Sequence, residues 1–289
     1  MIKQSLNIVA ILTFLFLLYL FGSLLVNAFP ALTTGKMFNL GYWDYRSLNF
    51  SVLGMLFGTI VVSCIAFFIA IPLGLSAAVF LSEFLRGNKR YYSKFAMEML
   101  AGIPSVIFGL LGVTILVPLM QKFNMKFNGF SGNSLLTAGI LLAFMILPTM
   151  ITFTDDAFRC VSKTMRDQGY VLGLTKLQVI SKIVLPQAKQ GIIAAALLSL
   201  GRALGETIAI YLVIGRSDIL FNRDYLSFNS LFNAGQSLTT KLGGSEIAIA
   251  YGDPEHWQNL MALGVLLWAI VLFFSILNEF VNQYFRESS

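Results

Sequence analysis

Six long apolar stretches constrain this chain more than any other feature of its sequence. Each is close to or longer than the ~20 residues that an α-helix needs to cross a lipid bilayer. The stretches cover residues 6–28, 52–81, 95–120, 135–153, 191–214 and 260–281. None alternates apolar and polar residues with the two-residue period of a membrane barrel strand. They predict an all-α integral membrane protein with one six-helix domain over residues 1–289.

The composition agrees with this class and excludes several others. Hydrophobic residues make up 57% of the chain and charged residues 12%, whereas soluble proteins carry about 25% charged residues. Two cysteines, Cys64 and Cys160, are too few for a disulfide scaffold. The net charge of +6 is not gathered into a Lys/Arg block, so no nucleic-acid partner is expected. The first stretch exceeds the roughly 7–15 apolar residues of a signal peptide and is predicted to stay as a helix.

The distribution of basic residues predicts the orientation in the membrane. With the N-terminus inside, twelve Lys and Arg residues lie in inner segments and seven in outer ones. The positive-inside rule therefore places both termini in the cytoplasm. In this orientation residues 154–190 form a cytoplasmic loop and residues 215–257 form an extracellular or periplasmic one.

Motifs for cofactor binding or catalysis are missing. The sequence contains no G-x-x-x-x-G-K-[ST] loop for ATP and no G-x-S-x-G nucleophile motif. Its single histidine, His256, cannot form a zinc site with two distant cysteines. His256 precedes Trp257, and an interfacial position is expected for it. The chain is therefore expected to bind no metal and no cofactor of its own.

The loop 154–190 has a pattern of two short helices around a turn. Gly173 can adopt the left-handed conformation that ends a helix. After it, apolar residues follow at helical spacing, and Pro186 is predicted to close the segment before the fifth span. Periodicity alone leaves open a short interfacial helix that packs on the bundle.

The spacing in this loop is similar to a motif in permeases of ATP-binding-cassette importers, E-A-A-x3-G-x9-I-x-L-P. Its last four fixed positions match Gly173, Ile183, Leu185 and Pro186. The E-A-A triplet falls on Asp167-Gln168-Gly169, which keeps only the leading acid. The resemblance implies that Asp167 and the four matching residues belong to the segment that couples the permease to a cytoplasmic ATPase.

Further motifs resemble the permeases of phosphate importers. They are Gly58-Thr59-Ile60, Ile71-Pro72-Leu73-Gly74, Leu81-Ser82-Glu83, the run 101–110 and Gly201-Arg202-Ala203-Leu204-Gly205-Glu206-Thr207. The last of them resembles the PstC-type subunit rather than its PstA-type partner.

This resemblance implies a six-helix, type I-like importer permease in a bacterial inner membrane, surrounded by lipid. A homologous second permease would complete the translocation path, and an extracytoplasmic phosphate-binding protein would deliver the solute. Two copies of a cytoplasmic ATPase would bind ATP and drive alternating access. This chain would then carry out no bond chemistry itself.

Arg202 and Glu206 place two charges within the fifth predicted span. A charge at mid-membrane costs about 2.5–3.5 kcal/mol, and the i,i+4 spacing allows the two side chains to pair. One interpretation is an ion pair that locks helices together. The other is an anion path, because the planar fork of Arg matches two phosphate oxygens. In that path Glu206 would hold Arg202 in place and limit how tightly the anion binds.

Glycines and a proline mark two further features of the spans. Gly102 and Pro104 are predicted to break the third helix, so that they and Ser105 could line the path. Gly201 and Gly205 have the small-xxx-small spacing of a close-packing helix face.

Three other functions compete with phosphate import. A permease for another oxyanion is disfavoured by the Gly201–Thr207 signature, and an ATP-independent channel or secondary transporter is disfavoured by the ATPase-docking loop. A membrane enzyme that uses Glu206 as acid or base would lack a second catalytic carboxylate nearby.

Overall fold

The computed structural model describes residues 2–125, 131–218 and 228–287. Six helices within these ranges are long and apolar enough to cross a membrane, as the sequence predicts. They are Leu6–Thr34, Leu53–Phe84, Ser105–Phe123, Leu135–Cys160, Lys176–Leu204 and Pro254–Phe280.

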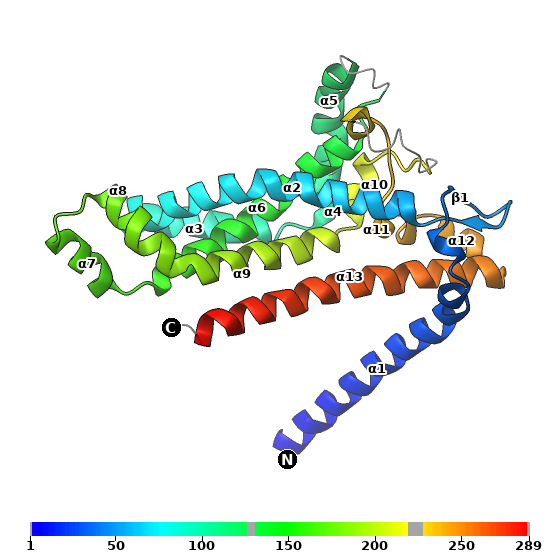
Figure 1. Ribbon diagram of the computed structural model, residues 1–289, viewed down its shortest axis with the longest axis horizontal. Helices are drawn as coiled ribbons and strands as arrows, with labels where there is room; N and C mark the ends of the chain where they lie inside the picture. Colours follow the sequence, from blue (N-terminus) through cyan, green and yellow to red (C-terminus); the bar gives the residue numbers. More distant parts are fainter. Residues whose placement is uncertain (1, 126–130, 219–227, 288–289) are drawn as a thin grey trace.

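The centre of the bundle is the pair α2 (Leu53–Val79) and α6 (Leu135–Cys160), which lie side by side in Figure 1. Small residues allow this close approach: a Cβ at Gly139 of α6 would lie only 2.6 Å from the Ile65 side chain of α2. Val62 and Ile146 are fully buried at the same contact. The most buried span is therefore the fourth, and the others pack around it.

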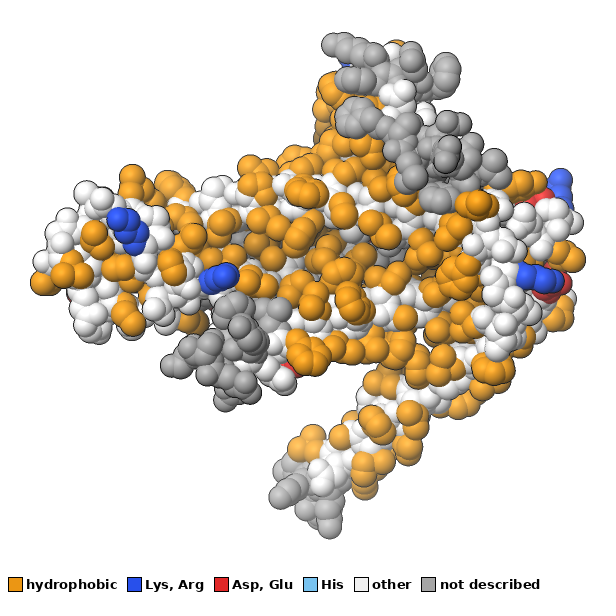
Figure 2. Space-filling view, in the orientation of Figure 1, with side chains coloured by type: hydrophobic (Ala, Val, Ile, Leu, Met, Phe, Trp, Pro, Cys, Tyr) orange, Lys and Arg blue, Asp and Glu red, His pale blue; other side chains and the backbone are white. Residues whose placement is uncertain are grey.

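The last helix, α13 (Pro254–Glu287), packs against α9 (Leu185–Leu204) and against α1 (Ile2–Thr34). α1 leans away from the rest of the bundle (Figure 1). Most of its apolar side chains are exposed, including Phe14 and Tyr19. Figure 2 shows apolar side chains along α1 and the bundle, with Lys and Arg toward the two ends of the bundle. Lipid or other subunits must cover such a surface.

The third apolar stretch is divided between two helices, so the structure differs from the predicted span 95–120. α3 (Gly87–Ala101) ends before Gly102, and α4 (Ser105–Leu111) begins after Pro104. A π-helical turn, Gly112–Leu116, then leads into α5 (Val117–Asn124). Gly102 ends α3, and Pro104 lies just before the first turn of α4, where its missing N–H breaks no helical bond.

The fifth predicted span, 191–214, is also two helices, α9 and α10 (Ile208–Val213). α9 continues from α8 (Lys176–Val179) through a π-helical turn, Ile180–Val184, so Pro186 does not close the segment as predicted. In this turn the Leu185 N–H bonds to the Ile180 carbonyl. Pro186 thus lies in the first turn of a renewed α-helix, where an N–H is not required.

One end of the bundle carries a compact cap, which we call the outer cap because the sequence predicts it to be outside. It consists of Lys36–Phe38, the antiparallel strands β1 (Trp43–Asp44) and β2 (Asn49–Phe50), Phe228–Phe232, α11 (Leu238–Leu242), α12 (Glu246–Ala250) and the first turns of α13. Trp43, Phe50, Leu238 and Leu260 form its apolar core. The described part of segment 215–257 is therefore packed; residues 219–227 lie outside the described residues.

The opposite end carries α7 (Lys163–Val171), the turn at Gly173 and α8, which project beyond the bundle (Figure 1). We call these elements the coupling tip. The fourth span extends to Cys160, beyond the predicted end at residue 153, so the connecting segment is shorter than the predicted loop 154–190.

Candidate functional site

The break between α9 and α10 places polar backbone within the predicted span 191–214, directly after the apolar helix that ends at Leu204. α9 ends at Leu204, and the Gly205 and Glu206 N–H groups bond to the Gly201 and Ala203 carbonyls, both at 3.3 Å. α10 begins at Ile208. Broken helices inside a membrane occur where they are buried in protein or line a water-filled path.

Arg202 and Glu206 are separated by this break and do not pair with each other. The i,i+4 contact expected from the sequence requires a continuous helix, which ends between them. Glu206 Oε1 instead accepts a hydrogen bond from the Ala209 N–H at 3.1 Å, at the start of α10. The ion-pair interpretation is therefore wrong for these two residues.

Arg202 joins the two broken helices. Its Nη1 donates to Thr149 Oγ1 on α6 at 2.9 Å, and its Nη2 donates to the Ala101 carbonyl at 3.2 Å. Ala101 is the last residue of α3, where carbonyls lack helical partners. The predicted break at Gly102 and Pro104 thus has a structural consequence, since it frees a carbonyl that orients Arg202.

The two broken helices also contact each other directly. α4 crosses α10 at Gly109, where a Cβ would lie 2.7 Å from Leu212 Cδ1 and 3.1 Å from Ala209 Cα. Ser105 opens α4 on the other side of the break from Ala101. Gly102, Pro104, Ser105, Arg202 and Glu206 are consequently all at or beside the two breaks.

A cavity of about 490 Å³ lies beside Arg202, between α6, α9 and α13. Its polar lining is Thr149, Arg202, Ser275 and Asn278, and the Asn278 Oδ1 is buried without a hydrogen-bond partner in the described structure. The other lining residues are Phe153, Leu197, Leu198, Gly201, Val271 and Phe274. Among the described residues, no carboxylate forms an ion pair with Arg202. The guanidinium retains N–H groups for an anion.

The coupling tip has the predicted turn. Gly173 has a φ of +78°, and the N–H of Leu174 bonds to the Gly169 carbonyl at 3.1 Å, closing α7. Thr175 then caps α8 and forms a capping box with Gln178. This box is a T-x-x-Q signal that sequence reasoning did not use.

The residues of the importer motif differ in their exposure to solvent: some pack inside the coupling tip, and others lie on its surface. Ile183 and Leu185 are partly buried, and a Cβ at Gly169 would lie 2.5 Å from Ile183 Cδ1. Gly169, the third residue of the triplet Asp167-Gln168-Gly169, therefore leaves room for the Ile183 side chain. Asp167 is exposed on α7. Three apolar side chains that project outward have no predicted role: Tyr170, Val171 and Leu172. Leu177 is also exposed, although the helical spacing places it on the apolar stripe of this segment.

Ion pairs attach the tip to the bundle. Arg166 of α7 pairs with Glu83 at the end of the second span and donates to the Phe158 carbonyl at 2.6 Å. Lys176 of α8 donates to the Glu83 carbonyl at 2.6 Å. These bonds connect the tip directly to the second and fourth spans.

A second group of ion pairs fixes α3 to α6. Asp155 is fully buried and receives two hydrogen bonds from Arg90 Nη2, at 2.7 and 2.8 Å. Lys94 lies 3.4 Å from the same carboxylate and also pairs with Asp156. The signal in the sequence was a pair of acids directly after an apolar stretch.

Comparison with known proteins gives a consistent result. A family model described as "Binding-protein-dependent transport system inner membrane component" matches residues 70–287. A phosphate transport system permease protein PstC from Haemophilus influenzae is 31% identical, over 96% of this chain and 90% of the relative. A PstC protein from Mesorhizobium japonicum is 34% identical, over 79% and 72%.

Solved structures share the fold at low sequence identity. A MetNI methionine ABC transporter in an inward-facing conformation matches with a TM-score of 0.60 at 16% identity, covering 81% of this chain and 94% of that one. A bacterial alginate ABC transporter, in complex with a periplasmic protein bound to an alginate pentasaccharide, matches with a TM-score of 0.58 at 16% identity, covering 96% and 94%.

Proposed function

This chain belongs to the family of binding-protein-dependent transport system inner membrane components, and we propose that it is the PstC-type permease subunit of an ATP-driven importer of inorganic phosphate. It is a multi-pass inner-membrane transport subunit and not an enzyme, since ATP hydrolysis belongs to a separate ATPase. The curated relatives named PstC support phosphate as the solute.

The observation that carries the proposal is Arg202. Its guanidinium lies at a break in a membrane span, beside a cavity, and has no carboxylate partner among the described residues. A cation without a counter-ion is costly at this depth. A passing phosphate would supply the missing negative charge, and the bonds to Thr149 and Ala101 keep the fork oriented toward it.

Glu206 has a separate role in this proposal. Its carboxylate bonds to the start of α10, one residue beyond the break, and not to Arg202. It therefore fixes the short helix and places a negative charge near the path. That charge would weaken binding of the anion and so assist its release.

The coupling tip supports a cytoplasmic ATPase partner. Val171, Leu172 and Leu177 are 87%, 78% and 69% exposed in a segment that carries the importer motif. Apolar side chains exposed together indicate a protein contact. Two copies of the ATPase would hold the ATP, one against this tip and one against a second permease.

A homologous second permease would cover the face beside Arg202. Ile107 and Leu110 of α4 are exposed, and a Cβ at Gly201 would meet no atom within 4 Å in this chain. The small-xxx-small face at Gly201 and Gly205 therefore has no partner within the described part of this chain. An importer permease also works with a substrate-binding protein, here a phosphate-binding one on the outer side.

The test is phosphate uptake per assembled complex for variants of Arg202. Arg202→Gln removes a charge-assisted contact to the anion, so we expect uptake to fall by about 10-fold or more while assembly is retained. Arg202→Lys keeps the charge but loses the fork, and its uptake should also fall. Arg86→Gln, an exposed arginine at the start of α3, is the matched control and should transport normally.

Two results would contradict the proposal. Full uptake by assembled Arg202→Gln would remove the arginine from the path. The second result is competition by another oxyanion. If an excess of sulfate abolished the uptake of labelled phosphate, the chain would be a permease for a different oxyanion.

A further inference from the structure

The outer cap encloses a fully buried lysine. The Lys241 side chain is 1% exposed, and its Nζ lies 2.7 Å from Asp218 Oδ2 and 2.9 Å from Glu246 Oε1. The same Nζ lies 5.4 Å from the centre of the Trp43 ring. A buried ammonium is tolerated only with such compensation, so the cap is built around this group.

The two carboxylates are held very differently. Glu246 is 15% exposed, and its second oxygen, Oε2, lies 2.9 Å from Nε2 of His256, which is itself buried. Glu246 is thus fixed from two sides, within the cap. Asp218 is 30% exposed, and Lys241 is its one ion-pair partner in the described part of the chain. Because Asp218 is more exposed and has one ion-pair partner among the described residues, its ion pair with Lys241 should break more readily than the Lys241–Glu246 pair.

Asp218 follows the fifth span in the chain and lies outside the elements that form the cap. It follows α10 after Gly215 and Arg216, both of which have a positive φ, +93° and +53°. The Ile214 carbonyl and the Ser217 N–H bond to the backbone of Gly235 at 3.1 and 3.2 Å, which leads into α11. The Lys241–Asp218 bond therefore connects the outer end of the broken fifth span to the cap.

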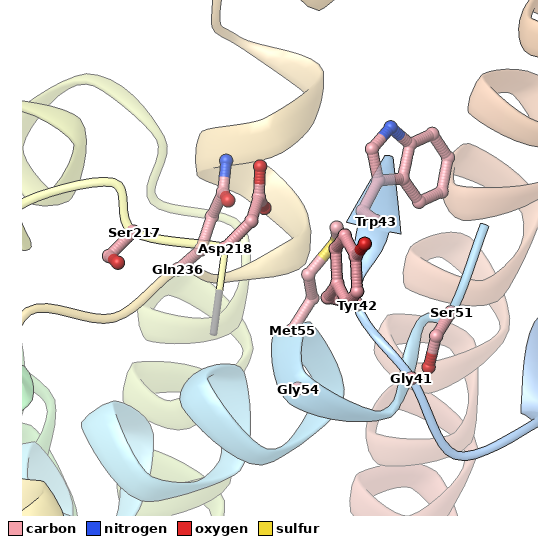
Figure 3. A pocket seen from close by; sticks show the side chains of 9 residues that line it. All are labelled: Gly41, Tyr42, Trp43, Ser51, Gly54, Met55, Ser217, Asp218 and Gln236. Atoms are coloured by element: carbon pink, nitrogen blue, oxygen red, sulfur yellow. The ribbon is translucent and has the colours of Figure 1, made fainter. Parts of the chain in front are cut away.

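The surroundings of Asp218 favour its release to water. Burial raises the pKa of the Asp218 carboxyl above its ordinary value, although Lys241 opposes this effect. Partial burial thus makes the ionised form of Asp218 less stable than it would be in water, and exposure to water would remove this cost. Asp218 also lines a cavity of about 10 Å³ with Gln236 and Trp43 (Figure 3), room for about one water molecule.

Two buried polar atoms at that cavity have no partner in the described structure. They are Gln236 Oε1 and Trp43 Nε1, on residues that are 7% and 4% exposed. Each loses the hydrogen bond that it would make to water. Entry of water at this point would satisfy them and solvate Asp218 at the same time.

We infer that Lys241 is the positioning residue of an outer gate. Glu246 keeps Lys241 in the cap, and Lys241 holds Asp218 and with it the outer end of α10. The gate opens when Asp218 leaves Lys241 for water, while the Lys241–Glu246–His256 contacts persist. The inference rests on the proposed function only in that a transporter opens to each side in turn, and it does not depend on which solute is carried.

The experiment measures access to the cavity in the assembled transporter. Ser51 lines the cavity and is 3% exposed, so Ser51→Cys is a near-isosteric reporter, with Cys64 and Cys160 replaced by Ser. In this background Asp218→Asn removes the charged bond, and we expect a membrane-impermeant maleimide to react roughly 10-fold faster. Asp218→Glu keeps a carboxylate and should react slowly. Asp44→Asn changes a partly exposed carboxylate next to the hairpin turn of the same cap; it is the matched control and should also react slowly.

A second measurement separates a gate from a simple structural bond. ATP hydrolysis without any solute or binding protein should rise in Asp218→Asn, while its melting midpoint stays close to that of Asp44→Asn. An unchanged labelling rate would overturn the gate. So would faster labelling that merely accompanies a lowered melting midpoint, because the bond would then only fasten the fold. Phosphate uptake by the unmodified transporter is measured separately, so its absence would refute the solute and leave the gate standing.

Discussion

The outer cap and the face around Arg202 solve the problem of a cation in opposite ways. In the cap, Lys241 is fully buried and satisfied by two carboxylates of the same chain. At the break in the fifth span, Arg202 is exposed and donates only to a hydroxyl and a backbone carbonyl. The buried charge of the cap is therefore neutralised within one chain. The face around Arg202 keeps unused N–H donors that could bind a solute. Together with the coupling tip, it also exposes apolar side chains that other subunits could cover.

The largest expected difference between the two regions is in stability. Lys241→Met leaves the largely buried Glu246 and the partly exposed Asp218 without their cation, so we expect a loss of about 3 kcal/mol in the free energy of unfolding. Arg202→Met leaves no carboxylate without a partner, so its free energy of unfolding should fall by less than about 1 kcal/mol. Thermal unfolding of the two purified variants, with Lys36→Met as an exposed control in the cap, measures both. Equal losses for Lys241→Met and Arg202→Met would show that the two cations are not used differently.

A second test compares Gly58 of α2, which packs against the chain leading into α11 of the cap, with Gly201 on the face beside Arg202. A Cβ at Gly58 of α2 would lie 2.0 Å from the Gln236 carbonyl oxygen, a backbone atom that cannot move aside cheaply. Gly58→Ala should therefore destabilise the chain by about 1–3 kcal/mol. Gly201 has no neighbour within 4 Å, and Gly201→Ala should stabilise the isolated subunit by about 0.5–1 kcal/mol through helix propensity. Unfolding midpoints that shift in the same direction would contradict the difference in packing.

Sequence reasoning succeeded where local chemistry decides the structure. The six spans follow from the length of the apolar stretches, the turn at Gly173 follows from the conformational freedom of glycine, and the break at Pro104 follows from its missing N–H. Each of these depends on a few neighbouring residues.

It failed at a helix end that the apolar pattern hides and at contacts that join different elements of the cap. The i,i+4 spacing predicts a Glu206–Arg202 pair, but the helix ends at Leu204, between the two residues. His256 was expected at an interface but is buried against Glu246, and Lys241 gave no sign of its two partners. The partners of Lys241 lie in separate segments of the chain that only the packed cap brings together.

A third test compares the coupling tip with the cap through backbone conformation. Gly173 and Gly252 have φ values of +78° and +97°, and no atom lies within 4 Å of a Cβ at either. Valine at each position should cost about 1–2 kcal/mol, since L-residues resist this region. Only Gly173→Val displaces the tip, so ATPase association and uptake should fall in that variant and not in Gly252→Val. Equal uptake by the two variants, at equal amounts of membrane-inserted protein, would remove the coupling role.

The smallest effect concerns Asp218, the more exposed of the two carboxylates that pair with Lys241. Because burial raises the pKa of Asp218, the folded chain binds this proton more tightly than the unfolded chain does. Stability from this group is thus fully present at low pH and is lost as the pH rises from the ordinary carboxyl pKa through the raised one. Asp218→Asn cannot titrate, so the unfolding midpoint of the wild type relative to this variant should fall over that interval and then stay constant. If instead the midpoint of the wild type rose with pH relative to that of Asp218→Asn, the pairing with Lys241 would lower the Asp218 pKa more than burial raises it. Asp218 would then be held as firmly as Glu246.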